Sequence, residues 1–321
     1  MQGRHKTFPR QYNGREPPVE FFAVGRPDFQ THPLDQERHM RRVLIIIVLT
    51  MLSACGFWLS ELSVAEDAAK RAAVPSLESL FAGDMEIIDL TYPLNAESPY
   101  WPADDYIPFS LKTIATLKND GVLSKAFTSP EHLGTHIDAP NHFEPNQPSV
   151  DQIPVKQFFA PGVVIDISPQ AEVDADYRMS VADITDWEKE HGKIPEGAVV
   201  MAKTGWGRFW TNFARYKNQD VRGGLHFPGF SDEAAQFLVK QRKIRGIGID
   251  TLSIDHGPSK DFAVHHTING AGKYALENVA YLDKLPARGF YLVIAPIKIE
   301  TGSGGPTRIF AILPPGTSES E

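Results

Sequence analysis

The sequence of 321 residues contains a single cysteine, Cys55. A disulfide needs two thiols, so a disulfide framework within the chain is excluded. The net charge is −8, and after residue 56 no basic stripe is interleaved with aromatic residues, which argues against nucleic acid as a partner. The sequence also lacks a Walker loop, a dinucleotide-binding loop and internal repeats. Its Gly-rich run at residues 302–305 opens no helix, so we interpret that run as a turn.

A long uncharged run occurs near the amino terminus. Met40–Arg42 is basic, residues 43–52 are apolar, and residues 53–56 are Ser-Ala-Cys-Gly. This order is typical of a secretory signal peptide. Residues 52–55, Leu-Ser-Ala-Cys, resemble a bacterial lipoprotein box, which predicts that Cys55 is lipidated. The alternative is an uncleaved membrane anchor, because the uncharged stretch continues to Ser60, near the lower limit of ~18 residues for a span.

These features predict four segments and a location. Residues 1–39 are polar and Pro-rich, and are either a disordered tail or upstream of a true start at Met40. Residues 40–55 form the lipoprotein-like signal peptide and residues 56–80 a tether. Residues 81–316 are long enough for one domain with a sizeable core. We expect a lipoprotein of the bacterial cell envelope, anchored in the membrane through its lipid and facing the periplasm or the exterior.

Short runs rich in Val and Ile and bounded by turn residues predict strands at residues 85–90, 163–167, 198–203, 244–249, 291–299 and 309–313. Residues 180–190 and 231–241 each begin with a serine followed by acidic residues, which predicts two helices with capped amino termini. Strands and helices do not alternate strictly. The pattern therefore favours an α/β fold with a mixed sheet and flanking helices.

Residues 132–142 read His-Leu-Gly-Thr-His-Ile-Asp-Ala-Pro-Asn-His and contain the strongest chemical signal in the chain. Imidazole nitrogens and carboxylate oxygens are the ligands that first-row divalent cations take from proteins. Gly134 and Pro140 argue against a continuous helix, so we predict an extended segment that turns at Gly134. In a strand, His136 and Asp138 share one face. Ionisable groups packed this densely are costly without a cation among them.

A second cluster lies in residues 250–278 and contains His256, His265, His266 and Glu277. By itself it is a weaker signal than the first segment. It can supply the ligands that one short peptide cannot, because a metal site needs donors from several directions.

The two clusters together resemble the cyclase family of metal-dependent hydrolases, which includes bacterial kynurenine formamidases and isatin hydrolases. The resemblance is carried by the His-x-Gly-Thr-His-x-Asp-x-Pro-x-His motif and by His265, twelve residues before Glu277. It extends over residues 87–314, including residues 203–206 and 248–255. It implies a β-rich swivelling β/β/α single domain and assembly as a homo-oligomer. It also implies His142 as the catalytic acid/base and five ligands for one or two ions of zinc or manganese: His132, His136, Asp138, His265 and Glu277.

The implied reaction is hydrolysis of an aryl amide carbon–nitrogen bond in a small aromatic amide, as in the kynurenine formamidases. The alternative is a lactam or other cyclic amide or ester, as in the isatin hydrolases. Trp101 and Trp206 could stack on a planar substrate or pack in the core. Lys203 stands where many relatives carry arginine, a cation of different geometry.

Two histidines receive other assignments, and one rival function stays open. We expect His266 to support the ligands rather than bind metal, and His256 to line the pocket or cap a turn. The rival is a non-catalytic, lipid-anchored protein that binds a metal or a solute. His142 argues against it, because binding alone needs no proton shuttle.

Overall fold

A computed structural model describes residues 77–315. The predicted tail, the signal peptide with Cys55 and the tether up to residue 76 lie outside the described residues. The last residues of the predicted tether fall in α2 (Leu77–Ala82). Within residues 77–315, no helix is long and apolar enough to cross a membrane. The described residues all belong to one compact unit.

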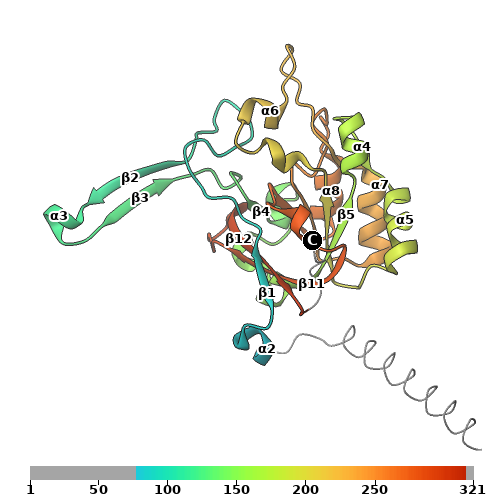
Figure 1. The fold of residues 1–321 in the computed structure, drawn as a ribbon. Coiled ribbons are helices and arrows are strands. Elements are labelled where there is room, and N and C mark those ends of the chain that lie inside the picture. Colours follow the sequence, from blue (N-terminus) through green and yellow to red (C-terminus); the bar gives the residue numbers. More distant parts are fainter. Residues whose placement is uncertain (1–76, 316–321) are drawn as a thin grey trace, which may run out of the picture. The chain divides into compact units, whose positions relative to one another are not determined.

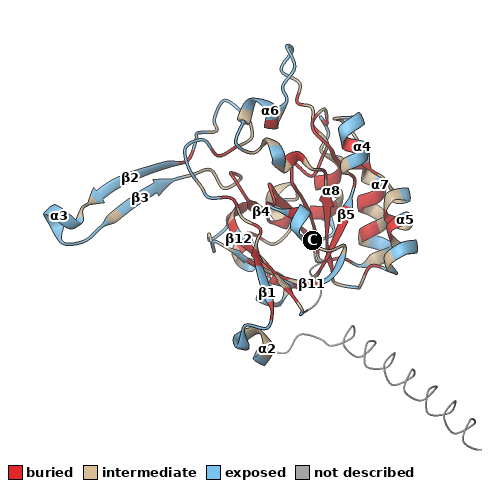
Figure 2. Ribbon diagram, in the orientation of Figure 1, coloured by how far each residue is buried: buried red, intermediate tan, exposed pale blue. Residues whose placement is uncertain are grey.

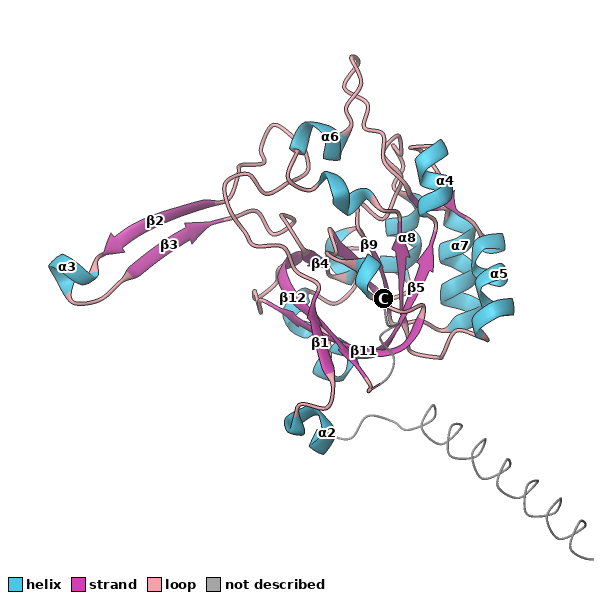
Figure 3. Cartoon of the chain, viewed as in Figure 1, coloured by secondary structure: helices cyan, strands magenta, loops and turns pink. Residues whose placement is uncertain are grey.

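The centre of the domain is an eight-stranded mixed sheet (Figures 1 and 3). Its order in space is β1 (Glu86–Asp89), β12 (Gly304–Leu313), β11 (Arg288–Pro296), β5 (Phe159–Asp166), β7 (Val199–Lys203), β9 (Gly246–Ile249), β10 (Tyr274–Glu277) and β4 (His136–Asp138). Strand β4 pairs with β12 as well as with β10, so the sheet closes on itself like a barrel. The pairs from β5 through β7 and β9 to β10 are parallel, and the others are antiparallel.

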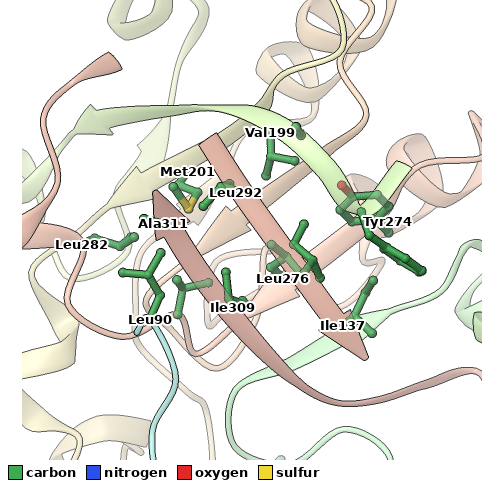
Figure 4. Close-up of a cluster of buried hydrophobic side chains, with 14 of the residues drawn as sticks. Leu90, Ile137, Val199, Met201, Tyr274, Leu276, Leu282, Leu292, Ile309 and Ala311 are labelled. Atoms are coloured by element: carbon green, nitrogen blue, oxygen red, sulfur yellow. The ribbon is translucent and has the colours of Figure 1, made fainter. Parts of the chain in front are cut away.

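The two faces of this closed sheet carry separate cores. Because side chains alternate across a strand, Val199 and Met201 of β7 point to one cluster, and Val200 and Ala202 point to another. The first cluster fills the inside of the sheet, where buried side chains of β4, β10, β11 and β12 meet (Figure 4). The second lies between the outer face and the helices.

Helices α5 (Val181–His191), α7 (Asp232–Phe237) and α8 (Ala263–Gly270) cover the outer face with Ile184, Ala234 and Ile268. Ser180 caps α5 in a capping box and Ser231 caps α7. The shorter elements are α4 (Ser168–Val173), α6 (Phe213–Lys217), β6 (Arg178–Met179), β8 (Gly229–Phe230), η1 (Pro140–His142), η2 (Val150–Gln152), η3 (Val155–Phe158), η4 (Trp206–Phe209), η5 (Leu238–Arg242) and η6 (Leu282–Lys284).

A hairpin stands apart from this body. Strands β2 (Ser110–Ala115) and β3 (Ser124–Thr128) pair with each other and with no other strand of the described chain, and α3 (Leu117–Asp120) lies at their tip. We call residues 110–128 the arm. It projects away from the sheet (Figure 1), and none of its residues is buried (Figure 2). The sequence reasoning did not predict it.

The predicted fold class is confirmed: the chain forms a mixed α/β domain with a closed sheet and flanking helices. All six predicted strands and both predicted helices are present with shifted ends. The helix predicted at residues 231–241 is α7 followed by the π-helical turn η5. The interpretation of residues 302–305 as a turn is wrong in part, because Gly304 and Gly305 begin β12 and pair with β4.

Candidate metal centre

The register between β4 and β10 builds the first half of the site. Glu277 lies directly opposite His136, and Ala275 lies opposite Asp138. Opposed residues of an antiparallel pair point to the same side of the sheet. Ile137 points into the inner core, so the side chains of His136, Asp138 and Glu277 all lie on the outer face.

Helix α8 supplies the second half through His265. Nε2 of His265 lies 3.3 Å from Oε1 of Glu277 and 3.5 Å from Oδ2 of Asp138. Nε2 of His136 lies 3.2 Å from Oδ1 of Asp138 and 3.4 Å from Oε2 of Glu277. All four side chains are buried. Two distant parts of the chain therefore place their donors around one point.

His132 lies at the edge of this cluster. Its Nδ1 is 2.7 Å from Oδ1 of Asp138, and its Nε2 is 2.9 Å from the Ser303 hydroxyl. The ring fits because Gly304 has no side chain: a Cβ there would collide with the carbonyl oxygen of Ile137 and lie 2.7 Å from Cε1 of His132. The donors form two triads that share Asp138, namely His132, His136 and Asp138, and Asp138, His265 and Glu277.

Neighbouring groups orient two of the imidazoles. Nδ1 of His136 lies 2.8 Å from the carbonyl oxygen of Gly134, which can only accept, so Nδ1 carries the proton. Nδ1 of His265 lies 2.7 Å from Oδ2 of Asp255, which also accepts the backbone N–H of His265. Each contact leaves Nε2 free to face the cluster, the arrangement found in histidines that bind metal.

The charges of the cluster favour a cation. Burial opposes a proton on His136, but the nearby carboxylates of Asp138 and Glu277 together outweigh burial and raise its pKa to about 10. Burial likewise opposes a charge on Asp138, yet the surrounding imidazoles of His132, His136 and His265 together hold its pKa well below the ordinary value. Buried carboxylates need compensating positive charge.

Two buried atoms of the cluster have no hydrogen-bond partner among the described residues: Nε2 of His136 and Oδ2 of Asp138. An unpaired buried polar atom costs about 1–3 kcal/mol. Both atoms are of the kinds that bind divalent cations, and imidazole with carboxylate is a donor set that zinc and manganese accept. The residues present therefore fit a metal ion.

A pocket of about 180 Å³ opens beside the cluster. Its walls come from four regions of the chain and are largely aromatic: Tyr100, Trp101, Tyr106, His132, His136, His142, Phe143, Leu252, Ser253, Phe262, His265, Glu277 and Asn278. Trp101 lines the pocket, and its contact with substrate stays a prediction. Tyr106, Phe143 and Phe262 were not predicted, although Phe143 directly follows the motif.

His142 lines this pocket with its ring stacked on His132, the two centroids 3.8 Å apart. Burial lowers the pKa of His142 to about 3, with Asp138 opposing and the neighbouring histidines adding to the shift. The ring is therefore neutral. The shift is large because the ring is enclosed in the pocket among other imidazoles.

Trp206 does not reach the pocket. Its side chain is buried, its indole N–H donates to the carbonyl oxygen of Tyr216 at 2.7 Å, and it packs with Phe227. Large aromatic side chains gain most by complete burial, so the core-packing alternative describes Trp206 and its predicted contact with substrate is not found.

Three further side chains are now placed. Nδ1 of His266 contacts Glu144 at 2.9 Å outside the pocket, and His256 does not line it. Lys203 forms an ion pair with Asp166 at 2.5 Å. The role of Asp255 was missed, although it ends the 248–255 stretch that carried part of the resemblance.

The comparisons with known proteins agree with this geometry. The Cyclase family model matches residues 88–256. The isatin hydrolase of Roseibium aggregatum is 32% identical over 250 residues, covering 73% of this chain and 94% of the relative. The kynurenine formamidase of Bacillus cytotoxicus is 29% identical over 231 residues, covering 72% and 98%. The solved structure of isatin hydrolase A from Labrenzia aggregata bound to benzyl benzoate superposes with a TM-score of 0.69 at 36% identity, covering 74% of this chain and 97% of that one.

The family model covers more than half of the chain, and the isatin hydrolase exceeds 30% identity over almost its whole length. Similarity of that extent includes the His132–His142 motif and the strands that carry it. The chain belongs to the cyclase family.

Proposed function

We propose that this protein is a metal-dependent amidohydrolase that opens a carbon–nitrogen bond in a small aryl amide. The observation that carries the proposal is the convergence of His136 and Asp138 with His265 and Glu277 beside an aromatic pocket that also holds His142. A protein that only binds a metal or a solute has no use for a neutral imidazole beside the ligands. The geometry therefore favours the enzyme over the rival function.

The metal would be held by the two triads that share Asp138. When bound, a divalent cation lowers the pKa of water and polarises a substrate carbonyl. We propose zinc or manganese, because both accept this donor set. The shared carboxylate of Asp138 supports a site for one ion or for two adjacent ions, and elemental analysis of the purified protein distinguishes them.

The residues of the pocket would position the substrate and move the proton. Trp101, Phe143 and Phe262 provide flat apolar walls on which an aromatic ring can stack, and they exclude water from the reacting bond. His142 lines the pocket and stacks on His132 beside the donors, and it would accept the proton of the attacking water. The departing nitrogen then needs a proton, which the same imidazole can return.

Among aryl amides, we propose a lactam of the isatin type as the first candidate. The isatin hydrolases with which this chain was compared are 31% to 36% identical to it. An arylformamide such as N-formylkynurenine is the second candidate, because the kynurenine formamidase of Bacillus cytotoxicus matches along 98% of its length.

The test is hydrolysis of isatin and of N-formylkynurenine by the full chain supplied with zinc or manganese. We expect His142→Ala to abolish turnover while metal content stays unchanged. His266→Ala is the matched control, because that imidazole is half-exposed and lies outside the pocket. Turnover by the His142 variant equal to that of the control would refute the assigned role, and no hydrolysis by the unmodified, metal-loaded chain would refute the function.

The cellular location is a separate proposal. We propose that residues 40–55 act as a lipoprotein signal and that lipidated Cys55 anchors the enzyme at the bacterial cell envelope. The support is the basic–apolar–small order of these residues and the box at residues 52–55. Mass spectrometry of the amino terminus should find lipid on Cys55. An unmodified Cys55 within an uncleaved chain would contradict the proposal.

A further inference from the structure

We infer that a second cavity of the domain binds a small aromatic molecule that carries both an amino group and a carboxylate. This second cavity has a volume of about 700 Å³ and shares no lining residue with the pocket of about 180 Å³ beside the metal centre. Binding sites for small molecules typically occupy about 300–1,000 Å³. The proposed reaction does not use the second cavity, so its lining needs a separate explanation.

The second cavity lies at the carboxyl ends of the parallel strands. Among its lining residues, Lys203 is the last residue of β7, Asp250 directly follows β9, and Ser168 lies two residues after β5. In α/β proteins, both open sheets and barrels bind their ligands at this edge, because the loops that follow the strands converge there. The cavity therefore lies where this type of fold places ligand sites.

Aromatic side chains supply one wall of the second cavity. The rings of Tyr92 and Trp210 stack with centroids 3.9 Å apart, and the ring of Tyr281 lies 5.6 Å from that of Tyr92. Tyr281 is 41% exposed and has a positive φ of 55°, a strained conformation for a bulky residue. Strain of this kind is concentrated at ligand sites. A flat aromatic ring can pack against this wall.

The hydroxyl of Tyr92 has no partner for its hydrogen bond. Tyr92 is 8% exposed, and its backbone N–H donates to the Thr135 hydroxyl at 3.1 Å, but its own hydroxyl forms no hydrogen bond within residues 77–315. Gly207 leaves room beside this hydroxyl, since a Cβ there would lie 2.9 Å from the oxygen. Both residues line the second cavity. A buried polar group without a partner is costly, and a polar group of a ligand would satisfy it.

Two cations border the second cavity, and one of them is unpaired. Lys203 pairs with Asp166 at 2.5 Å, whereas Arg208 forms no ion pair with any residue that the structure describes. The guanidinium of Arg208 lies 4.7 Å from the ring centre of Phe209. It also lies against Gly205, where a Cβ would be 3.2 Å from Nη1. An arginine held in this way is prepared to bind a carboxylate through two hydrogen bonds.

Two carboxylates border the same cavity. Asp250 is 5% exposed, and Thr204 donates to its Oδ1 with the backbone N–H at 2.9 Å and the hydroxyl at 2.6 Å. Burial raises the pKa of Asp250, so a donor or a cation beside it would stabilise its charge. Asp283 is exposed and forms no ion pair in the described part of the chain. The unpaired arginine and these carboxylates together select a ligand with a carboxylate and an amino group.

The experiment measures binding of anthranilate to the full, metal-loaded chain by isothermal titration calorimetry. Benzoate lacks the amino group and aniline lacks the carboxylate, so these two compounds separate the two contacts. The cavity variants are Arg208→Gln and Asp283→Asn. Arg215→Gln is the matched control, because that guanidinium also lies over Phe209, at 4.2 Å, but does not line the cavity. Phe262→Ala alters the pocket beside the metal centre instead, and circular dichroism establishes that each variant is folded.

We expect anthranilate to bind the unmodified chain and the Arg215→Gln control equally, and Arg208→Gln to weaken its binding by about 10-fold, because charge-assisted hydrogen bonds are lost. Arg208→Gln should also weaken benzoate but not aniline, and Asp283→Asn should weaken aniline but not benzoate. An unmodified chain that does not bind anthranilate, or equal losses in the two arginine variants, would overturn the inference. So would a loss confined to Phe262→Ala, because anthranilate would then occupy the pocket beside the metal centre.

Discussion

Replacing Asp255 by asparagine tests how the protein holds His265 toward the metal. The carboxylate is 3% exposed, and one of its oxygens accepts both N–H groups of His265, at 2.7 and 3.1 Å. The other accepts the backbone N–H of Val264 at 3.1 Å. Burial opposes the charge of Asp255, but the hydrogen bond and charge of His265, together with the backbone N–H groups of Val264 and His265, outweigh burial and hold its pKa below the ordinary value.

The asparagine variant keeps only one of the two accepting oxygens. Whichever way its amide is turned, an NH₂ group faces a backbone or ring N–H, so one buried donor is left without an acceptor. That loss should lower the free energy of unfolding by about 1–3 kcal/mol. The imidazole also loses its charged partner, which should weaken metal binding by about 10- to 100-fold. This corresponds to about 1.4–2.7 kcal/mol of binding free energy.

The assay is a competition titration with a chelating dye at a temperature where the variant is fully folded. Asp261→Asn is the control, because that exposed carboxylate has the same chemistry and contacts only Ser259 at 3.3 Å. A lower melting temperature with unchanged metal affinity would show that Asp255 merely caps α8. The positioning role would then be wrong.

Two further predictions concern packing and pH. Gly304→Ala should displace His132 and lower the free energy of unfolding by about 1–3 kcal/mol, because the added Cβ collides with backbone. Gly270→Ala is the control and should have no such effect, because a Cβ there meets nothing closer than 3.9 Å. Equal melting temperatures for the two variants would contradict the packing argument. Glu188 and Arg242 form a bidentate ion pair with two contacts of 2.6 Å, which lowers the pKa of Glu188. The stability that this pair contributes is therefore fully present above the unfolded pKa of about 4.3 and is lost as pH falls through the folded pKa. Glu188→Gln should therefore lower the melting temperature at pH 7, and the deficit should shrink in acid, as thermal unfolding at several pH values can show; a deficit independent of pH would exclude the ion pair as its source.

Local sequence signals were sufficient where the physical cause is local. Ser180 and Ser231 cap α5 and α7 because a serine before an acidic first turn satisfies free backbone N–H groups wherever it occurs. Gly134 adopts a positive φ of 66°, as the predicted turn requires. Runs of Val and Ile became strands because their shape favours the pleated backbone.

Local sequence signals did not predict the position of a residue where its burial depends on partners far away in the sequence. The sequence gives Trp101 and Trp206 the same two possible roles, yet one lines the pocket and the other lies in the core. The arm was missed because its alternating pattern is weak and none of its apolar residues is buried. The 302–305 run was taken for a turn because nothing in its neighbours indicates that Gly304 pairs with β4.

The chain by itself determines the donors of the centre: imidazoles and carboxylates at short spacing are too costly to bury without a cation, whatever the fold. It does not determine how they meet. The register that sets His136 against Glu277, the placement of α8 and the gap that Gly304 leaves for His132 appear only when the sheet closes. The physical reason is that periodicity encodes which face of an element is buried, whereas pairing between segments far apart in sequence is set by the packing of the whole domain.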